Sequence, residues 1–219
     1  TGNNSGSLII ANNTFSNQLL TASTASAFVI YNSGIISNSI TINGNVISGF
    51  THSASTSGGF FGLYNNAASS GNLQMSSNSF SNLALSSITG PAYMLYNRAA
   101  VAGTISDLSF SNNQVASLDF TTSTGPFYGI NNTGTAFSNL SVAGNSFVDI
   151  ATTATASPRY MIFNNGLGAT AINISTNQLT NFTSTLNTTG LYYGILNSGA
   201  CAGNLNIDAN TITNLNLTA

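Results

Sequence analysis

A repeat of about 33 residues is the feature that most constrains how this chain folds. One eight-residue pattern, apolar-x-apolar-x-x-Asn-x-apolar, occurs seven times, from LIIANNTF at Leu8 to LNIDANTI at Leu205. Successive copies of its Asn are 32, 33, 35, 32, 32 and 33 residues apart. The first column of asparagines is Asn13, Asn45, Asn78, Asn113, Asn145, Asn177 and Asn210. A fixed period of this length indicates a solenoid, in which each repeat is one supersecondary unit.

A second pattern keeps the same period, half a repeat out of phase. It consists of an aromatic residue, three mostly apolar residues and an Asn, as in FVIYN, FGLYN, YMLYN, FYGIN, YMIFN and YGILN. The predicted aromatic column is Phe28, Phe61, Tyr93, Phe127, Tyr160 and Tyr193. The second predicted Asn column is Asn32, Asn65, Asn97, Asn131, Asn164 and Asn197. Two columns with one period predict a single domain over residues 1–219.

Each repeat is expected to contain about three short strands. The alternation of apolar and other residues at the start of the first pattern predicts a strand with one buried face. Pro91, Pro126 and Pro158 stand just before the aromatic segment, where a missing N–H disturbs a sheet least. Helix capping signals are not found. The prediction is an all-β, right-handed parallel β-helix with about 33 residues per coil and about 6.5 coils.

One coil cannot bury its own apolar face, so successive coils must stack. Stacking places equivalent residues about 4.8 Å apart. We therefore expect each Asn column to form a hydrogen-bonded ladder that satisfies the backbone at a turn, and the aromatic column to stack in the same way.

The segments SITINGNVIS, AINISTNQLT and NLNIDANTIT resemble the repeat of secreted pectate-lyase-like parallel β-helices and of autotransporter adhesins. The resemblance covers all seven copies and implies the fold, whereas the functions found on that fold are diverse. The segment ISDLSFSNNQVASL is also similar to a leucine-rich repeat. Leucine-rich repeats run 20–29 residues, and the longer period with its aromatic strand favours the β-helix.

Composition excludes two functions. Only six residues are charged, with no Lys and no Glu, and two arginines cannot neutralise the phosphates of a nucleic acid. A membrane-spanning helix requires about 18 continuous apolar residues, and the chain has no such run. Cys201 is the only cysteine, so no intramolecular disulfide forms.

Candidate catalytic residues are few, and we expect neither catalysis nor a metal or other cofactor. Asp149 falls in a column otherwise filled by Asn17, Asn82, Asn181 and Asn214, so a ladder role is favoured over a catalytic pair with Asp119. His52, the only histidine, lies in a Ser/Thr-rich stretch and is expected to be exposed. Arg98 and Arg159 border the aromatic segment and are also expected at the surface.

The favoured function is that of an extracellular or cell-surface structural protein that forms a filament, sheath or stalk. Neither end of the repeat array shows a charged or helical cap, which open solenoid ends normally require. The predicted partner is therefore a second copy, stacked head to tail. An adhesin or glycan-binding module with exposed aromatic and Asn/Thr rows is one alternative. An ice-binding solenoid is another, although the Ser/Thr stretches TASTAS, THSASTS and TTATAS differ in length and sequence.

Overall fold

The computed structural model describes residues 5–21, 26–52, 57–86, 88–99, 105–134, 137–154, 157–167, 169–186 and 190–218. These residues form a β-solenoid of three parallel sheets, and no helix occurs among them. Parts of the three Ser/Thr stretches lie outside the described residues.

Each of the first six coils contributes one strand to each sheet, and the first two split their second strand; β21 and β22 belong to the last, partial turn. The first sheet contains β1 (Leu8–Ala11), β5 (Ile40–Asn43), β9 (Leu73–Ser76), β12 (Ile105–Ser111), β15 (Phe137–Ala143), β18 (Ala169–Ser175) and β21 (Cys201–Asp208). The second contains β2 (Thr14–Ser16), β6 (Val46–Ser48), β10 (Ser79–Leu85), β13 (Gln114–Phe120), β16 (Ser146–Ala154), β19 (Gln178–Leu186) and β22 (Thr211–Thr218), with β3 (Leu19–Leu20) and β7 (Thr51–His52) at its side. The third contains β4 (Ala27–Asn32), β8 (Phe60–Asn65), β11 (Ala92–Asn97), β14 (Phe127–Asn132), β17 (Arg159–Asn164) and β20 (Tyr192–Asn197).

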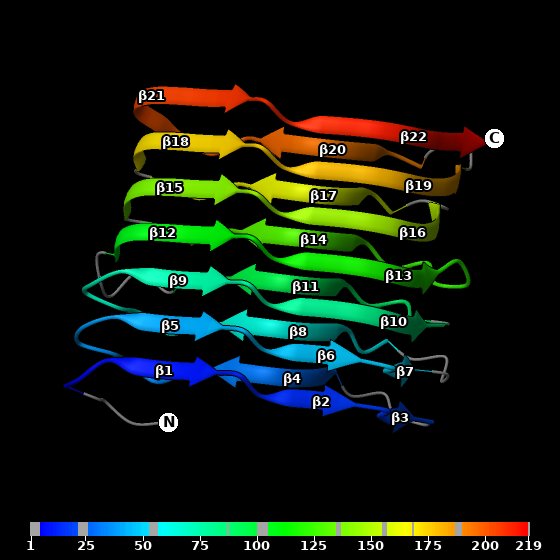
Figure 1. Ribbon diagram of the computed structural model, residues 1–219, viewed down its shortest axis with the longest axis horizontal. Coiled ribbons are helices and arrows are strands. Elements are labelled where there is room, and N and C mark those ends of the chain that lie inside the picture. Colours follow the sequence, from blue (N-terminus) through cyan, green and yellow to red (C-terminus); the bar gives the residue numbers. More distant parts are fainter. Residues whose placement is uncertain are drawn as a thin grey trace.

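The coil is right-handed, as Figure 1 shows: the first two sheets face the viewer with strands running left to right, and the third returns behind them while the chain climbs. This confirms the predicted β-helix with three strands per coil. The leucine-rich alternative is wrong, because the return segment of each coil is a paired strand.

The bend between the first and second strands depends on a left-handed residue just before each ladder Asn. Its φ is 57° at Asn12, 62° at Gly44, 55° at Asn112 and 55° at Thr176. A second left-handed column falls within or after the second strand and includes Asp149, with φ 55°. Asn and Gly adopt this conformation most readily, which explains why polar turn residues recur at these positions.

The first Asn ladder lies inside the bend and runs in one direction. The backbone N–H and the Nδ2 of Asn113 both donate to Asn145 Oδ1, at 3.0 and 2.9 Å, and the same amide donates to Met75 O at 2.9 Å. Equivalent bonds link Asn13 through Asn45, Asn78, Asn113, Asn145 and Asn177 to Asn210. The predicted first ladder is therefore confirmed at every member.

The core fills the space between the sheets with apolar columns of equivalent residues. Leu73, Leu108, Leu140 and Ile172 form one such column, each at most 1% exposed. Large and small residues alternate across the interior: a Cβ on Gly62 would lie 2.4 Å from the ring of Phe80. Such close fitting is typical of protein interiors and fixes the register of the third sheet against the second.

We expect the substitution Asn113→Ala to destabilise the protein by about 3 kcal/mol, because it strips an acceptor from Asn78 and donors from Met75 O and Asn145 Oδ1 in a buried site. Urea unfolding followed by circular dichroism measures the change. Gln114→Ala, the exposed neighbour in β13, is the matched control and should shift the midpoint little. Equal effects of the two substitutions would contradict a structural role for the ladder.

Candidate functional site

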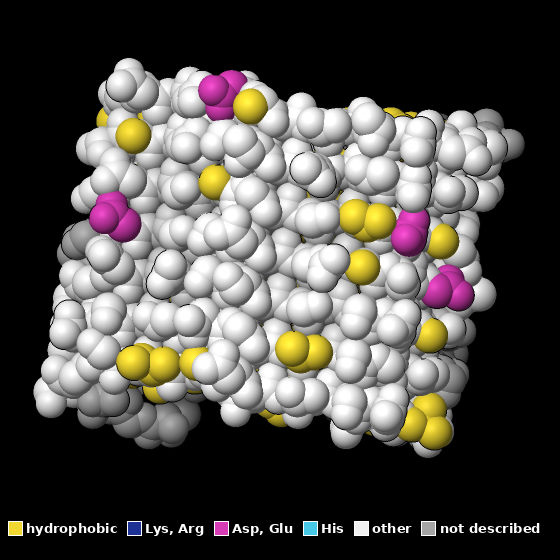
Figure 2. All heavy atoms as spheres, in the orientation of Figure 1, with side chains coloured by type: hydrophobic (Ala, Val, Ile, Leu, Met, Phe, Trp, Pro, Cys, Tyr) yellow, Lys and Arg dark blue, Asp and Glu magenta, His cyan; other side chains and the backbone are white. Residues whose placement is uncertain are grey.

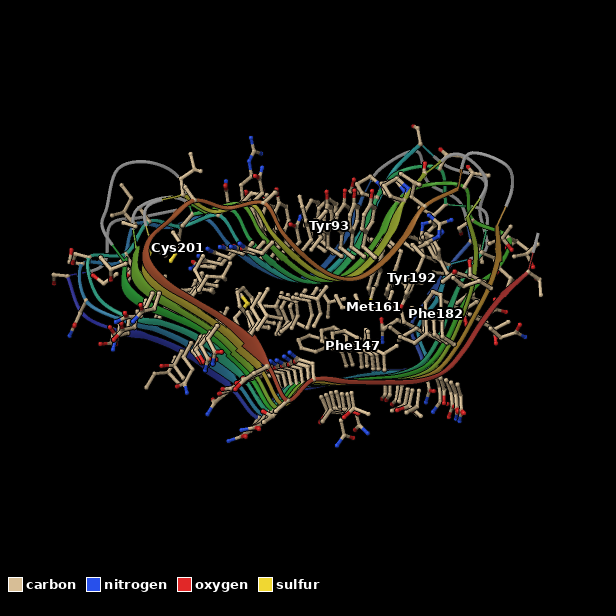
Figure 3. All side chains as sticks on the ribbon, turned by 90° about the horizontal axis from the view of Figure 1, so that it is seen from above. Tyr93, Phe147, Met161, Phe182, Tyr192 and Cys201 are labelled. Carbon is tan, nitrogen blue, oxygen red and sulfur yellow. The ribbon has the colours of Figure 1, made fainter. Side chains whose placement is uncertain are left out.

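The outer face of the third sheet is concave and lined with aromatic rings. Figure 3, viewed along the solenoid axis, places Tyr93 in this hollow, on the side of the sheet away from Met161 and Phe147. We call this surface the aromatic groove; its described rings are Phe28, Tyr31, Phe61, Tyr64, Tyr93, Tyr96, Tyr128, Tyr160, Phe163 and Tyr193.

One ring from each of the six coils forms a continuous stack along the groove. Neighbouring ring centroids are 4.6 Å apart for Phe28–Phe61 and for Tyr93–Tyr128, and 4.9 Å for Tyr160–Tyr193. The faces of most rings are covered by their neighbours, so ring edges and phenol hydroxyls border the open side. At the first coil, Phe28 is 46% exposed and Tyr31 48%.

Two predicted members of these columns are wrong by one residue. Tyr93 pairs with Tyr128 rather than Phe127, and Phe127 is fully buried in register with Ala92 and Arg159. Asn97 Nδ2 donates to Asn132 Oδ1 at 2.9 Å, so Asn131 is not in the second ladder. The coil between Tyr93 and Tyr128 spans 35 residues, and a shift of one residue moves side chains to the opposite face of a strand.

The second ladder otherwise follows the prediction. Asn32, Asn65, Asn97, Asn132 and Asn164 each donate through Nδ2 to the Oδ1 of the Asn one coil further on, ending at Asn197. Asn131 instead lies in the outward column of Tyr31, Tyr64 and Tyr96, and its buried Oδ1 has no hydrogen-bond partner.

The groove contains one exposed cation. Arg98 donates to the Tyr64 hydroxyl, and this bond raises the pKa of the guanidinium. Burial raises the pKa of Tyr128 to about 12 and that of Tyr93 further. The phenols of Tyr93 and Tyr128 therefore remain neutral donors and acceptors at physiological pH.

Arg159 is buried, which corrects the expectation of a surface residue. It occupies the inward column of Phe127 and Tyr192, and its guanidinium carbon lies 5.0 Å from the centre of the Phe120 ring. Its two terminal nitrogens donate to backbone carbonyls of Ser123, Gly125 and Thr153. Burial lowers its pKa to about 10, so Arg159 is still charged at pH 7. Its hydrogen bonds link the segments of two neighbouring coils that contain these three carbonyls.

His52 is also buried rather than exposed. It lies in register with Leu20 and Leu85, two apolar residues of the neighbouring coils. Neither ring nitrogen has a hydrogen-bond partner, and burial lowers the pKa of the imidazole. The register of the second sheet places this side chain inward. The Ser/Thr-rich sequence around His52 gave no sign of that register.

Asp119 and Asp149, the two carboxylates weighed as a pair, hydrogen-bond to different neighbours. Asp119 accepts hydrogen bonds from the backbone N–H and hydroxyl of Thr121 at 3.0 and 2.7 Å. Asp149 accepts one from Asn181 Nδ2 at 2.8 Å, which confirms its predicted ladder position. Acidic side chains lie scattered over the face shown in Figure 2, where no Lys or Arg is visible.

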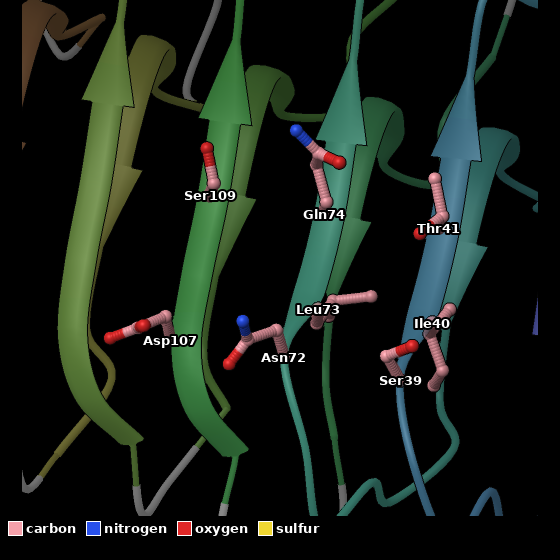
Figure 4. A pocket seen from close by; sticks show the side chains of 8 residues that line it. All are labelled: Ser39, Ile40, Thr41, Asn72, Leu73, Gln74, Asp107 and Ser109. Carbon is pink, nitrogen blue, oxygen red and sulfur yellow. The ribbon is translucent and has the colours of Figure 1, made fainter. Parts of the chain in front are cut away.

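A shallow hollow of about 300 Å³ lies on the outer face of the first sheet (Figure 4). Its described lining comes from β5, β9 and β12 and from the residues just before β5 and β9, and Asp107 is the one ionisable residue among them. Asp107 accepts a hydrogen bond from Asn139 Nδ2 at 2.6 Å. Serine and threonine hydroxyls and two side-chain amides line this hollow together with Ile40 and Leu73.

Within the described part of the chain, no three His, Cys, Asp or Glu side chains cluster as metal ligands would. Nor do the described segments include a helix with the length and hydropathy needed to cross a membrane. No protein-family model matches the chain, and neither the curated proteins nor the solved structures contain a significant match.

The acid sensitivity of the fold should depend on His52. Because its pKa is lowered in the folded state, the unfolded chain binds a proton more readily, and stability falls as the pH drops below about 6.5. We expect His52→Leu to stabilise the protein by about 1–2 kcal/mol at pH 7, since it removes an unpaired buried polar group. The gain should increase toward pH 5.

Thermal unfolding between pH 5 and pH 8 measures this effect. Thr51→Leu, on the adjacent outward position, is the control and should leave the pH dependence unchanged. An unchanged pH profile in His52→Leu would show that the buried imidazole is not responsible.

Proposed function

We propose that this chain is a structural β-solenoid module of an extracellular or cell-surface assembly, and that it extends by head-to-tail stacking of its end faces. The resemblance of its repeat to those of secreted β-helices and autotransporter adhesins supports this setting. The direction of the two Asn ladders carries the proposal.

Each ladder ends differently at the two faces of the solenoid. At the first coil, Asn13 and Asn32 are donors to the next coil, so their Oδ1 atoms face outward as acceptors. At the last coil, Asn210 and Asn197 supply the final Oδ1, and their own amides form the donor end. A head-to-tail arrangement places donors on acceptors, whereas a head-to-head arrangement opposes like groups. Such a heterologous contact produces open filaments.

Apolar surface on the last coil supports the same contact. Leu205 and Ile207 are 50% and 47% exposed, whereas Ile172 and Ile174, their equivalents one coil earlier, are at most 1% exposed. Ile212, Leu215 and Leu217 are also exposed by 39–46%. Burying these side chains under a further coil is favourable, and a net charge of −2 opposes association little.

Negative-stain electron microscopy and sedimentation velocity over a concentration series test the stacking. We expect rods that lengthen with concentration, and we expect Ile207→Asp to leave monomers because it buries a charge at the junction. Asn206→Asp adds the same charge to the outward neighbour and should assemble normally. Monomers of the unmodified chain at every concentration would contradict the proposal.

The aromatic groove favours a second candidate, the binding of a neutral glycan chain along the solenoid. Tyrosine provides rigid, amphipathic contact surface, and the stacked phenols offer a row of hydroxyls at the coil spacing. The scarcity of charge in the groove suits an uncharged ligand. The outward row Ser16, Ser48, Ser81, Ala116, Val148, Thr180 and Thr213 is not a regular threonine array and gives ice binding no comparable support.

Titration calorimetry with cellohexaose and chitohexaose tests this candidate. Tyr160→Phe removes one hydroxyl from the groove and should weaken binding about tenfold, a factor typical of one hydrogen bond. Tyr192→Phe, whose hydroxyl is buried inside the coil, is the matched control and should bind normally. Absence of binding to either sugar would remove the support for this function.

A further inference from the structure

The tyrosines of the chain are not spread evenly over the fold. Seven of the eight lie in the aromatic groove, and the eighth, Tyr192, packs against the core. The groove has two outward columns, whose members are paired coil by coil. The first column is Phe28, Phe61, Tyr93, Tyr128, Tyr160 and Tyr193, and the second is Tyr31, Tyr64, Tyr96, Asn131, Phe163 and Leu196. Each of the six coils therefore contributes at least one phenol to the groove.

These phenols form one continuous path, which changes column in the third coil. The path runs through Tyr31, Tyr64, Tyr96, Tyr93, Tyr128, Tyr160 and Tyr193. Successive ring centroids along it are 5.1, 4.8, 4.4, 4.6, 5.0 and 4.9 Å apart. The step between the columns is made by Tyr96 and Tyr93, whose ring planes differ by 15°. We call this set of seven residues the tyrosine path.

Ring stacking alone does not require a phenol in every coil. Phe28 stacks on Phe61 at 4.6 Å, and Phe61 stacks on Tyr93 at 5.2 Å, so phenylalanine serves equally well in these columns. Yet wherever one column contains a phenylalanine, the other column has a tyrosine in the same coil. A hydroxyl-bearing ring in every coil points to chemistry of the phenol itself.

We propose that the tyrosine path is an oxidative cross-linking site, in which neighbouring tyrosines couple to dityrosine. The co-reactant is an oxidant of the peroxidase class that consumes hydrogen peroxide. This inference extends the proposed structural role, but it applies to a single copy and does not depend on head-to-tail stacking.

The chemistry of the coupling balances with one peroxide per link. Each of two phenols loses one electron and one proton, and the two phenoxyl radicals form a carbon–carbon bond between ring positions ortho to the oxygens. Each ring then regains its aromatic form as the ortho hydrogen passes to its own oxygen. Two tyrosines and one hydrogen peroxide thus give one dityrosine and two waters.

The fold holds the reacting rings together before oxidation. Parallel strands keep equivalent Cα atoms about 4.8 Å apart. The χ2 torsion of an aromatic side chain is broad, so a ring can turn its edge toward its neighbour while the backbone stays in place. Because the two phenols are held in contact, coupling within the path competes well with coupling between separate molecules.

The oxidant reaches the path from the open side of the groove. Tyr31 is 48% exposed, and Tyr93 and Tyr160 are partly exposed, whereas Tyr64 is only 7% exposed. Contact between the rings allows a radical formed on an exposed tyrosine to pass to a buried one. Burial raises the pKa of Tyr128 to about 12, so this phenol starts neutral and releases its proton together with the electron.

Oxidation of the dilute full chain by a haem peroxidase with limiting hydrogen peroxide tests the proposal. All six contacts of the path are interrupted by the triple substitution Tyr64→Phe, Tyr93→Phe and Tyr160→Phe, which keeps every ring. The matched control is the triple substitution Tyr31→Phe, Tyr192→Phe and Tyr193→Phe. It leaves the same number of tyrosines but keeps the contacts from Tyr64 through Tyr160.

Dityrosine fluorescence measures the yield, and mass spectrometry of peptic peptides identifies the linked pairs by their loss of two hydrogen atoms. We expect cross-linked monomers from the unmodified chain and from the control. The interrupted variant should give a yield lower by a factor of about ten or more. In the unmodified chain, the linked pairs should be neighbours on the tyrosine path, and Tyr192 should remain unlinked.

Three results would overturn the proposal. Equal yields from the two triple variants would show that coupling depends on the number of tyrosines rather than on their contacts. Links that involve Tyr192 as often as the groove tyrosines, or links only between copies, would exclude a preformed site. Absence of dityrosine in the oxidised, unmodified chain would do the same, and none of these results affects the test of head-to-tail stacking by microscopy.

Discussion

The Asn ladder inside the first bend is the interaction on which the structure depends. Each bend exposes backbone groups that a sheet alone leaves unpaired, and the ladder amides satisfy them in a site closed to water. Asn113, for example, bonds to the next coil through two nitrogens and to Met75 O in the preceding coil. The ladder therefore fixes the register of every coil against its neighbours.

The direction of the ladder has consequences for the whole molecule. Because every amide donates toward the next coil, one face of the solenoid ends in acceptors and the other in donors. A nearly uncharged surface leaves little long-range repulsion between copies, and in the proposed head-to-tail stacking these two faces would form the junction. The aromatic groove lies on a different side, formed by the third sheet, and does not depend on the ladder polarity.

The sequence predicted the solenoid, its three strands per coil and both Asn ladders. It could do so because residues that recur at a fixed spacing along the chain lie on top of one another when the coils stack. The prediction failed at Phe127 and Asn131. The segment FYGINN contains two adjacent aromatic residues and two adjacent asparagines, so its spacing fits the columns in two ways, and this coil is two residues longer than the usual 33. The prediction also misplaced Arg159 and His52. Whether a side chain points inward or outward depends on its exact position in the strand. Arginine and histidine are usually exposed, so their residue types favoured the surface in both cases.

Hydrogen exchange of the Asn side-chain amides, measured by NMR on the chain labelled at asparagine, tests whether the ladder is continuous and buried. We expect the Nδ2 protons of Asn78, Asn113 and Asn145 to exchange far more slowly than those of outward asparagines such as Asn139. Comparable exchange rates for the two groups would contradict a continuous buried ladder.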